Sequence, residues 1–157
     1  MKKLIKYILL IIIVVFAVPP KNSTLSSLVR ELNYTNAVST YYTNSEVNVK
    51  NATVIKNGNS YLVQSDIKNC ESLKKEIENI QGQSISLNGT YSDYLFIKEK
   101  LLDSTIIEEE LYNIKTCYGY NNKLTKSVKI DNKNINIQVA FNNNKIVIGS
   151  PVILGSY

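Results

Sequence analysis

The strict alternation of side chains near the C-terminus constrains the fold more than any other feature of the sequence. Between residues 135 and 141, branched or aromatic side chains occupy every second position, with small or polar side chains between them. A period of two is that of a strand with one buried face. Turn sequences border this segment at Asp131–Asn134 and Asn142–Asn144, and Val128–Ile130 and Lys145–Ile148 read as further strands. The region therefore predicts consecutive antiparallel strands joined by short turns.

Helical and strand patterns alternate along the residues before this region. The expected elements are, in order, a helix at 25–38, an irregular stretch at 39–45, strands at 46–55 and 61–63 joined by an Asn57-Gly58 turn, a helix at 70–80, a strand at 84–87, a helix at 90–103 and a long strand at 111–120. This order predicts an α+β fold, a mostly antiparallel β-sheet with two to three helices on one face, after an N-terminal hydrophobic segment.

The first twenty residues have the pattern of an export segment. Three lysines lie within the first six residues, and an uncharged apolar run follows at 7–18. This is typical of a signal peptide, but the stretch 4–20 also reaches the roughly 17 residues that a transmembrane helix needs. The cleavage motif at Val15 and Ala17 is loose, so a cleaved signal and a retained N-terminal membrane anchor both stay open. Because the lysines stay on the cytoplasmic side, either one predicts an extracytoplasmic body, anchored in the cell membrane or secreted.

The positive charge of the chain is concentrated in the same segment. The net charge is +5, but residues 21–157 contain 15 bases and 13 acids. A body so close to neutral gives no indication of nucleic-acid binding. Together these patterns divide the chain into the export segment at 1–20, an amphipathic helix and linker at 21–45, and an α+β domain at 46–157.

The absence of histidine excludes several kinds of catalytic and metal site. Ser-His-Asp and Cys-His catalysis and the common zinc sites all need it. We therefore expect no catalytic residue, no metal and no cofactor. Cys70 and Cys117 are the two cysteines, and an exported location permits a disulfide between them. Two buried free thiols are the alternative.

Three groups of side chains are candidates for a partner surface. They are the apolar face of the first helix (Leu25, Leu28, Val29 and Leu32), a set of tyrosines (Tyr112, Tyr118 and Tyr120, with Tyr41 and Tyr42) and the lysines of the C-terminal third (Lys126 and Lys129, with Lys115, Lys123 and Lys133). The lysines would meet an anionic wall polymer or lipid head groups. Each group has a structural alternative: core packing for the helix face, compositional bias for the tyrosines, and protection of a sheet edge for the lysines.

The C-terminal segments resemble the end of a known family. Asn136–Phe141 and Ile148–Ile153, followed by the terminal Tyr157, resemble the YwmB-like proteins of Firmicutes, which typically end on a Gly-Thr/Ser-Pro-hydrophobic strand and a tyrosine. The helix–strand–Asn88-Gly89–helix order also fits that family, so the resemblance covers residues 25–157. It implies a mostly uncharacterised exported or anchored protein, with a curved sheet like that of the TATA-box-binding protein and helices on its convex face. It transfers no catalytic motif.

These features predict a membrane-tethered or secreted extracytoplasmic module that is not an enzyme and binds a protein or another cell-envelope component. The alternative is a small cell-wall-active hydrolase that uses carboxylates, for which Asp66 and Asp93 are the acids to test. A third class is an accessory of a secretion or sporulation machine that binds its partner through the helix containing Leu25–Leu32.

Overall fold

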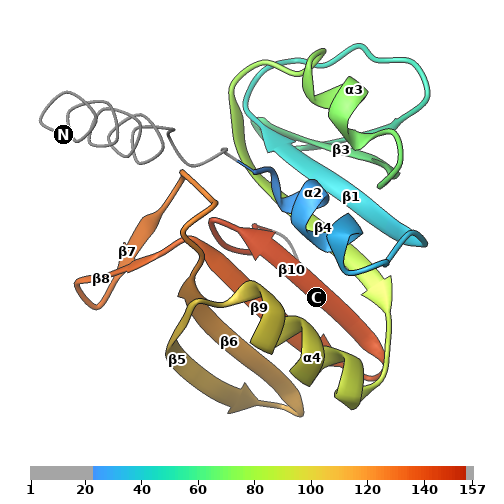
Figure 1. Cartoon of the computed structure of the whole chain (residues 1–157). Coiled ribbons are helices and arrows are strands. Elements are labelled where there is room, and N and C mark those ends of the chain that lie inside the picture. The colour runs from blue at the N-terminus through green and yellow to red at the C-terminus, as the bar shows by residue number, and fades with distance from the viewer. Residues whose placement is uncertain (1–22, 155–157) are drawn as a thin grey trace, which may run out of the picture.

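The computed structural model describes residues 23–154 as an eight-stranded antiparallel sheet with three helices on one face (Figure 1). A separate two-stranded ribbon projects from this body on the side where the chain enters it. The predicted α+β fold class is therefore confirmed. The predicted export segment at 1–20 lies outside the described residues.

The order of the strands divides the sheet into two halves. The helices are α2 (Leu25–Glu31), α3 (Cys70–Lys74) and α4 (Tyr91–Leu101). The strands are β1 (Ala37–Thr43), β2 (Thr53–Asn57), β3 (Ser60–Asp66), β4 (Ile80–Asn88), β5 (Ser104–Leu111), β6 (Ile114–Tyr120), β7 (Val128–Ile130), β8 (Lys133–Ile135), β9 (Ile137–Asn142) and β10 (Lys145–Ser150). The large sheet runs β2-β3-β1-β4-β10-β9-β6-β5, and β7 and β8 form the ribbon. The N-terminal half of the chain thus supplies four adjacent strands and meets the C-terminal half where β4 pairs with β10.

Turns rich in asparagine join many of these strands. Both residues of the two-residue loops Tyr112-Asn113, Asp131-Asn132 and Asn143-Asn144 have positive φ, between 45° and 66°. This is the type I′ hairpin turn, and asparagine and aspartate adopt positive φ more readily than other non-glycine residues. Gly58, with φ of 60°, begins the loop between β2 and β3. The hairpin predicted there is confirmed, with Gly58-Asn59 as its loop.

The predicted assignments of 39–45 and 46–52 are both wrong. The first helix ends at Glu31 instead of near residue 38, because Asn33 has a φ of 66° and leaves the helical conformation. The chain then enters β1, which lies between β3 and β4, whereas residues 46–52 are irregular. β1 is buried along most of its length, and Tyr41 donates its hydroxyl hydrogen to the Cys70 carbonyl at 3.0 Å. Small polar side chains on both faces of β1 hide this burial from a search for alternating apolar residues.

Two further element boundaries differ from the prediction. The helix expected at 70–80 ends at Lys74; Asn79 then takes a φ of 50°, and β4 begins at the next residue. The long strand expected at 111–120 is interrupted by the Tyr112-Asn113 turn. Before that turn, residues 104–111 form the edge strand β5, which the sequence pattern missed because charged and exposed residues fill it.

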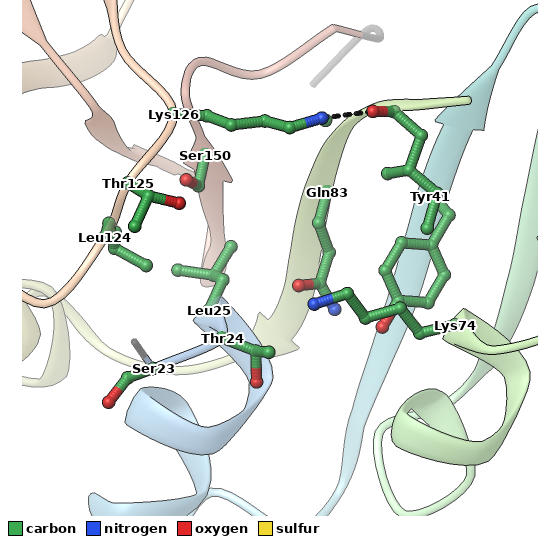
Figure 2. Close-up of a pocket in the computed structure, with 12 residues that line it drawn as sticks. Ser23, Thr24, Leu25, Tyr41, Lys74, Gln83, Leu124, Thr125, Lys126 and Ser150 are labelled. Carbon is green, nitrogen blue, oxygen red and sulfur yellow. Dashed lines mark hydrogen bonds between the residues drawn. The ribbon is translucent and has the colours of Figure 1, made fainter. Parts of the chain in front are cut away.

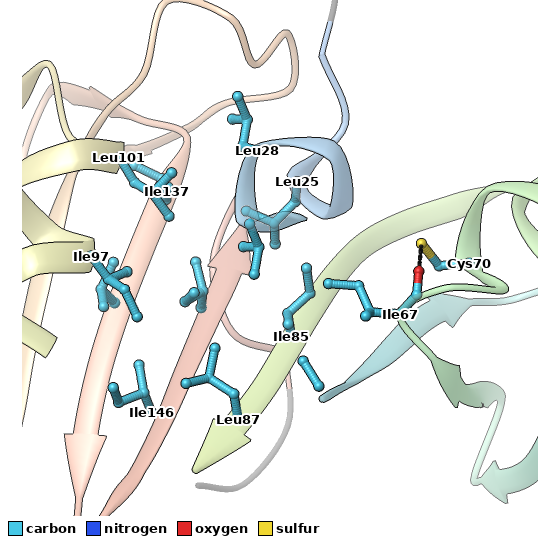
Figure 3. Close-up of a cluster of buried hydrophobic side chains, with 14 of the residues drawn as sticks. Leu25, Leu28, Ile67, Cys70, Ile85, Leu87, Ile97, Leu101, Ile137 and Ile146 are labelled. Atoms are coloured by element: carbon cyan, nitrogen blue, oxygen red, sulfur yellow. Dashed lines mark hydrogen bonds between the residues drawn. The ribbon is translucent and has the colours of Figure 1, made fainter. Parts of the chain in front are cut away.

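The core lies between the helices and the covered face of the sheet, and Figure 3 shows α2 and α4 packing into it together. Leu25 and Leu28 of α2 are 2% and 3% exposed, and they meet residues of β4, β9 and β10 in one continuous cluster. Residues 25–43 thus belong to the same sheet and core as residues 46–154. The predicted boundary between 21–45 and 46–157 is therefore wrong.

Candidate binding cleft

A cleft of about 140 Å³ lies where the chain enters the body (Figure 2). Three segments far apart in the sequence line it: Ser23–Leu25 at the start of α2, residues 80–83 at the start of β4, and residues 124–126. Lys74 of α3 and Tyr41 of β1 also face it. The Ser23 backbone N–H donates to the Lys123 carbonyl at 3.1 Å, so the start of α2 is bonded directly to the loop that lines the cleft.

A carboxylate fixes the α2 side of the cleft. Thr24 caps α2, and its hydroxyl also donates to Glu71 Oε1 of α3 at 2.5 Å. The buried Ser26 hydroxyl donates to the same oxygen at 2.7 Å. Burial alone would raise the pKa of Glu71, but these two donors and the nearby positive charge of Lys74 hold that pKa below its usual value. The ionised carboxylate of Glu71 therefore joins α3 to the start of α2 at the lining residue Thr24.

Two buried asparagines hold the loop on the other side. Asn136, at 0% exposure, donates from Nδ2 to the carbonyls of Asn121 at 2.8 Å and Leu124 at 2.9 Å. Its Oδ1 accepts from the Asn121 backbone N–H at 2.7 Å. Asn121 in turn donates from Nδ2 to the Leu101 carbonyl at the end of α4, at 2.7 Å. The position of the loop therefore depends on a side chain between β8 and β9.

The chemistry of the lining favours an anion. Lys74 and Lys126 supply ammonium groups, Gln83 an amide and Thr125 a hydroxyl, and no carboxylate is among the described lining residues. Lys126 extends across the cleft in Figure 2 and donates from Nζ to the Ile80 carbonyl, which leaves its charge without a carboxylate partner in this contact. Ammonium, amide and hydroxyl donors converging on one cavity suit phosphate or carboxylate groups.

The helix face predicted as a partner surface is used in the core instead. Leu25, Leu28 and Val29 are 2%, 3% and 0% exposed, and Leu32 packs against the same cluster while partly buried. Of the two alternatives for this helix face, the structure shows core packing and not an exposed partner surface. An apolar stripe at helical spacing cannot by itself distinguish core packing from partner binding.

The predicted tyrosines do not form one surface. Tyr112 is 88% exposed in the β5–β6 turn, whereas Tyr41 and Tyr42 are 1% and 8% exposed within β1. Tyr118 and Tyr120 lie two residues apart on β6, so they share a face with each other but not with the turn. The predicted common face is wrong because the turn interrupts the strand.

Of the predicted surface residues, Leu25, Tyr41 and Lys126 line the cleft, and Lys129 is exposed on the ribbon. Lys74, Gln83 and the other lining residues were missed because no spacing in the sequence relates the three segments. The one local signal was the group of hydroxyl residues on either side of Leu25 at 23–27, which predicts a helix start but not a cleft.

Of the two alternatives for Cys70 and Cys117, the structure shows free thiols and no disulfide. Both are buried free thiols: Cys70 Sγ lies 2.8 Å from the Ile67 carbonyl, and Cys117 Sγ lies 3.8 Å from Thr105 Oγ1. The Cys70 carbonyl accepts a hydrogen bond from the Tyr41 hydroxyl of β1, whereas Cys117 lies on β6. In the sheet, β1 and β6 are four strand spacings apart. That separation is roughly 19 Å at ~4.8 Å per strand, far beyond the ~7 Å that a bridge allows between Cα atoms.

The two acids considered for a hydrolase have local structural roles. Asp66 Oδ1 accepts from the Lys68 N–H at 2.8 Å, and Asp93 Oδ2 accepts from the Thr90 N–H at 2.8 Å. Asp93 also accepts from the Tyr34 hydroxyl at 3.0 Å, and the Thr90 donors lower its pKa. The structure therefore places these carboxylates at a turn and a helix cap, and it gives no support to a catalytic pair.

Comparison with known proteins adds no relative. No protein-family model matches the chain, and no curated protein or solved structure matches it. The resemblance to YwmB-like proteins therefore stays a prediction. Between residues 23 and 154, no helix is long and apolar enough to cross a membrane.

Proposed function

We propose that this protein is a membrane-tethered extracytoplasmic binding module without catalytic activity, and that its cleft binds an anionic component of the cell envelope. If the N-terminal segment is cleaved, the same module is secreted. The observation that carries the proposal is the 3.1 Å bond from Ser23 to Lys123, because it fixes the point where the chain enters the body at the rim of the cleft.

This geometry would hold the cleft close to the membrane. The apolar segment ends at Pro20, only three residues before Ser23. Three residues span at most roughly 10 Å. A retained anchor would therefore place the cleft near the membrane surface, where an envelope protein or an anionic wall polymer is accessible.

The lining supports the choice of an anionic ligand. Lys74 and Lys126 come from separate elements and reach the same cavity, so their two positive charges exceed the single negative charge of Glu71, which lies near Lys74. The body as a whole is close to neutral, so a local excess of positive charge at the cleft gives selectivity that net charge alone would not.

Fractionation of cells, with sizing of the product, tests the location. A full-length chain in the membrane fraction supports the anchor, a shortened product outside the cytoplasm supports secretion, and a soluble cytoplasmic product would contradict the proposal.

Titration of the purified full chain with inorganic phosphate and with poly(glycerol phosphate) tests the ligand. The double variant Lys74→Gln/Lys126→Gln should weaken binding at least tenfold, since each lysine supplies a charge-assisted contact. The control variant Lys145→Gln removes a lysine that does not line the cleft and should bind normally. Equal affinity for all three proteins would refute the cleft as the binding site.

A further inference from the structure

Four lysines gather on the segment that joins β6 to β9. Residues 121–135, here called the basic arm, have a net charge of +3, with one acid, Asp131, and the lysines Lys123, Lys126, Lys129 and Lys133. All four lysines are exposed. Of the four, only Lys123 has an ion-pair partner within 4.0 Å among residues 23–154, the exposed Glu31. Most of the positive charge of the arm is therefore presented to solvent.

The basic arm lies at the end of the body where the chain enters. Its β7–β8 ribbon is not part of the large sheet and projects on that side in Figure 1. The Ser23–Lys123 bond ties the base of the arm to the first described residue. Val128 and Ile130 on the ribbon are only half-buried and alternate with the exposed Lys129.

We propose that the basic arm docks onto the head groups of anionic phospholipids, so that the body rests on the membrane with the cleft at the bilayer surface. This inference rests on the membrane tether proposed above, which keeps the arm at high effective concentration near the lipid. Each lysine near an anionic surface favours docking by about fivefold, so a net charge of three favours it on the order of 100-fold. The attraction decays over about 8 Å at physiological ionic strength, a distance comparable to the tether span.

The arrangement of the ribbon favours a lipid surface over a protein partner. The register pairs Lys129 with Asn134 and Ile130 with Lys133, so Lys129 and Lys133 point to opposite faces of the ribbon. A protein partner that covers one face would meet only one of these charges. Head groups surround an interfacial ribbon on both faces, and its half-buried apolar side chains suit the boundary between head groups and acyl chains.

A fluorescent probe on the ribbon tests the docking. The full chain carries Asn132→Cys at the β7–β8 turn, labelled with an environment-sensitive dye, and is reconstituted into phosphatidylcholine vesicles with or without phosphatidylglycerol. Because Cys70 and Cys117 are buried, the identically treated wild-type chain supplies a low background. Quenching by a lipid-borne quencher should appear with phosphatidylglycerol and be lost in phosphatidylcholine alone and at high salt.

Charge variants show whether the arm is responsible. Lys129→Gln/Lys133→Gln should lower the ratio of docked to undocked arm roughly 25-fold. The control Lys50→Gln/Lys56→Gln removes the same charge at and before β2, the edge strand in the other half of the sheet, and should have no effect. All substituted lysines are exposed, and unchanged circular dichroism would confirm that the variants fold.

Several outcomes would overturn the proposal. One is equal quenching of the dye on neutral and anionic vesicles, and another is an equal loss of quenching in the arm variant and the control variant. A third is a change in dye fluorescence with soluble poly(glycerol phosphate) but not with anionic lipid, which would make the partner a polymer. Failure of the tether is recognised separately, because cells would then release a shortened product. Vesicle flotation of that product, with the same pair of variants, still tests the arm.

Discussion

Substitution of Asn136 should reveal how strongly one side chain holds the cleft together. Asn136→Ala removes three hydrogen bonds of 2.7, 2.8 and 2.9 Å at a site with 0% exposure. Each such bond contributes about 1 kcal/mol net, and buried partners left unsatisfied increase the loss, so we expect a destabilisation of about 3–5 kcal/mol. That is a large part of the roughly 5–15 kcal/mol that stabilises a typical domain.

Urea denaturation followed by circular dichroism measures this loss. With a slope of about 2 kcal/mol per molar, the midpoint should fall by about 1.5–2.5 M. Asn134→Ala is the matched control, because it removes an exposed asparagine two positions away on β8 and should change the stability by less than about 0.5 kcal/mol. If the two variants lose similar stability, or Asn136→Ala loses under about 1 kcal/mol, the network does not hold the loop as we argue.

Three further predictions concern the helices and the thiols. Leu28→Asp should prevent folding because it buries a charge in the core, whereas Leu111→Asp, at a side chain 65% exposed, should melt as the wild type does; a folded Leu28→Asp protein would contradict the packing of α2. Glu71→Gln should make the free energy of unfolding fall less steeply at acid pH. The pKa of Glu71 is lowered in the folded state, so its contribution to the free energy of unfolding is complete above the ordinary value of about 4.3 and is lost as the pH falls from there towards the folded pKa. Urea denaturation across that pH range measures this. If the free energy of unfolding of the variant falls as steeply as that of the wild type, groups other than Glu71 cause the acid sensitivity. Burial raises the pKa of both the Cys70 and Cys117 thiols, so neither should react with a thiol reagent at neutral pH in the folded protein, and both should react in denaturant without reductant; titration of fewer than two thiols there would indicate a bridge.

The acidic and basic features of the body have different roles. Lys98 pairs with Glu108 and Lys115 pairs with Glu110 beside α4, so the charges within each pair neutralise each other. The lysines of the basic arm lie on the segment that joins β6 to β9 and are mostly without such partners in the described part of the chain. The arm is therefore the region where added salt should weaken an interaction most strongly.

Local patterns in the sequence determined the C-terminal sheet, the hairpin near Gly58 and the helix that begins after Thr90. In each case a short-range cause was sufficient: alternation along one buried face, a residue suited to positive φ, or the Thr90–Asp93 capping box. The export segment is likewise a property of sequence alone, and its role stays a prediction.

Only the tertiary structure decided the central strand β1, the short α3 and the cleft. β1 is buried at six of its seven residues, and four of those six are Ala, Ser or Thr, so it has no alternating apolar pattern to recognise. The cleft depends on bonds between residues far apart in the chain, such as Thr24 with Glu71 and Asn136 with Asn121. Sequence spacing reports contacts along one helix or strand, whereas these contacts exist only once the sheet has brought separate segments together.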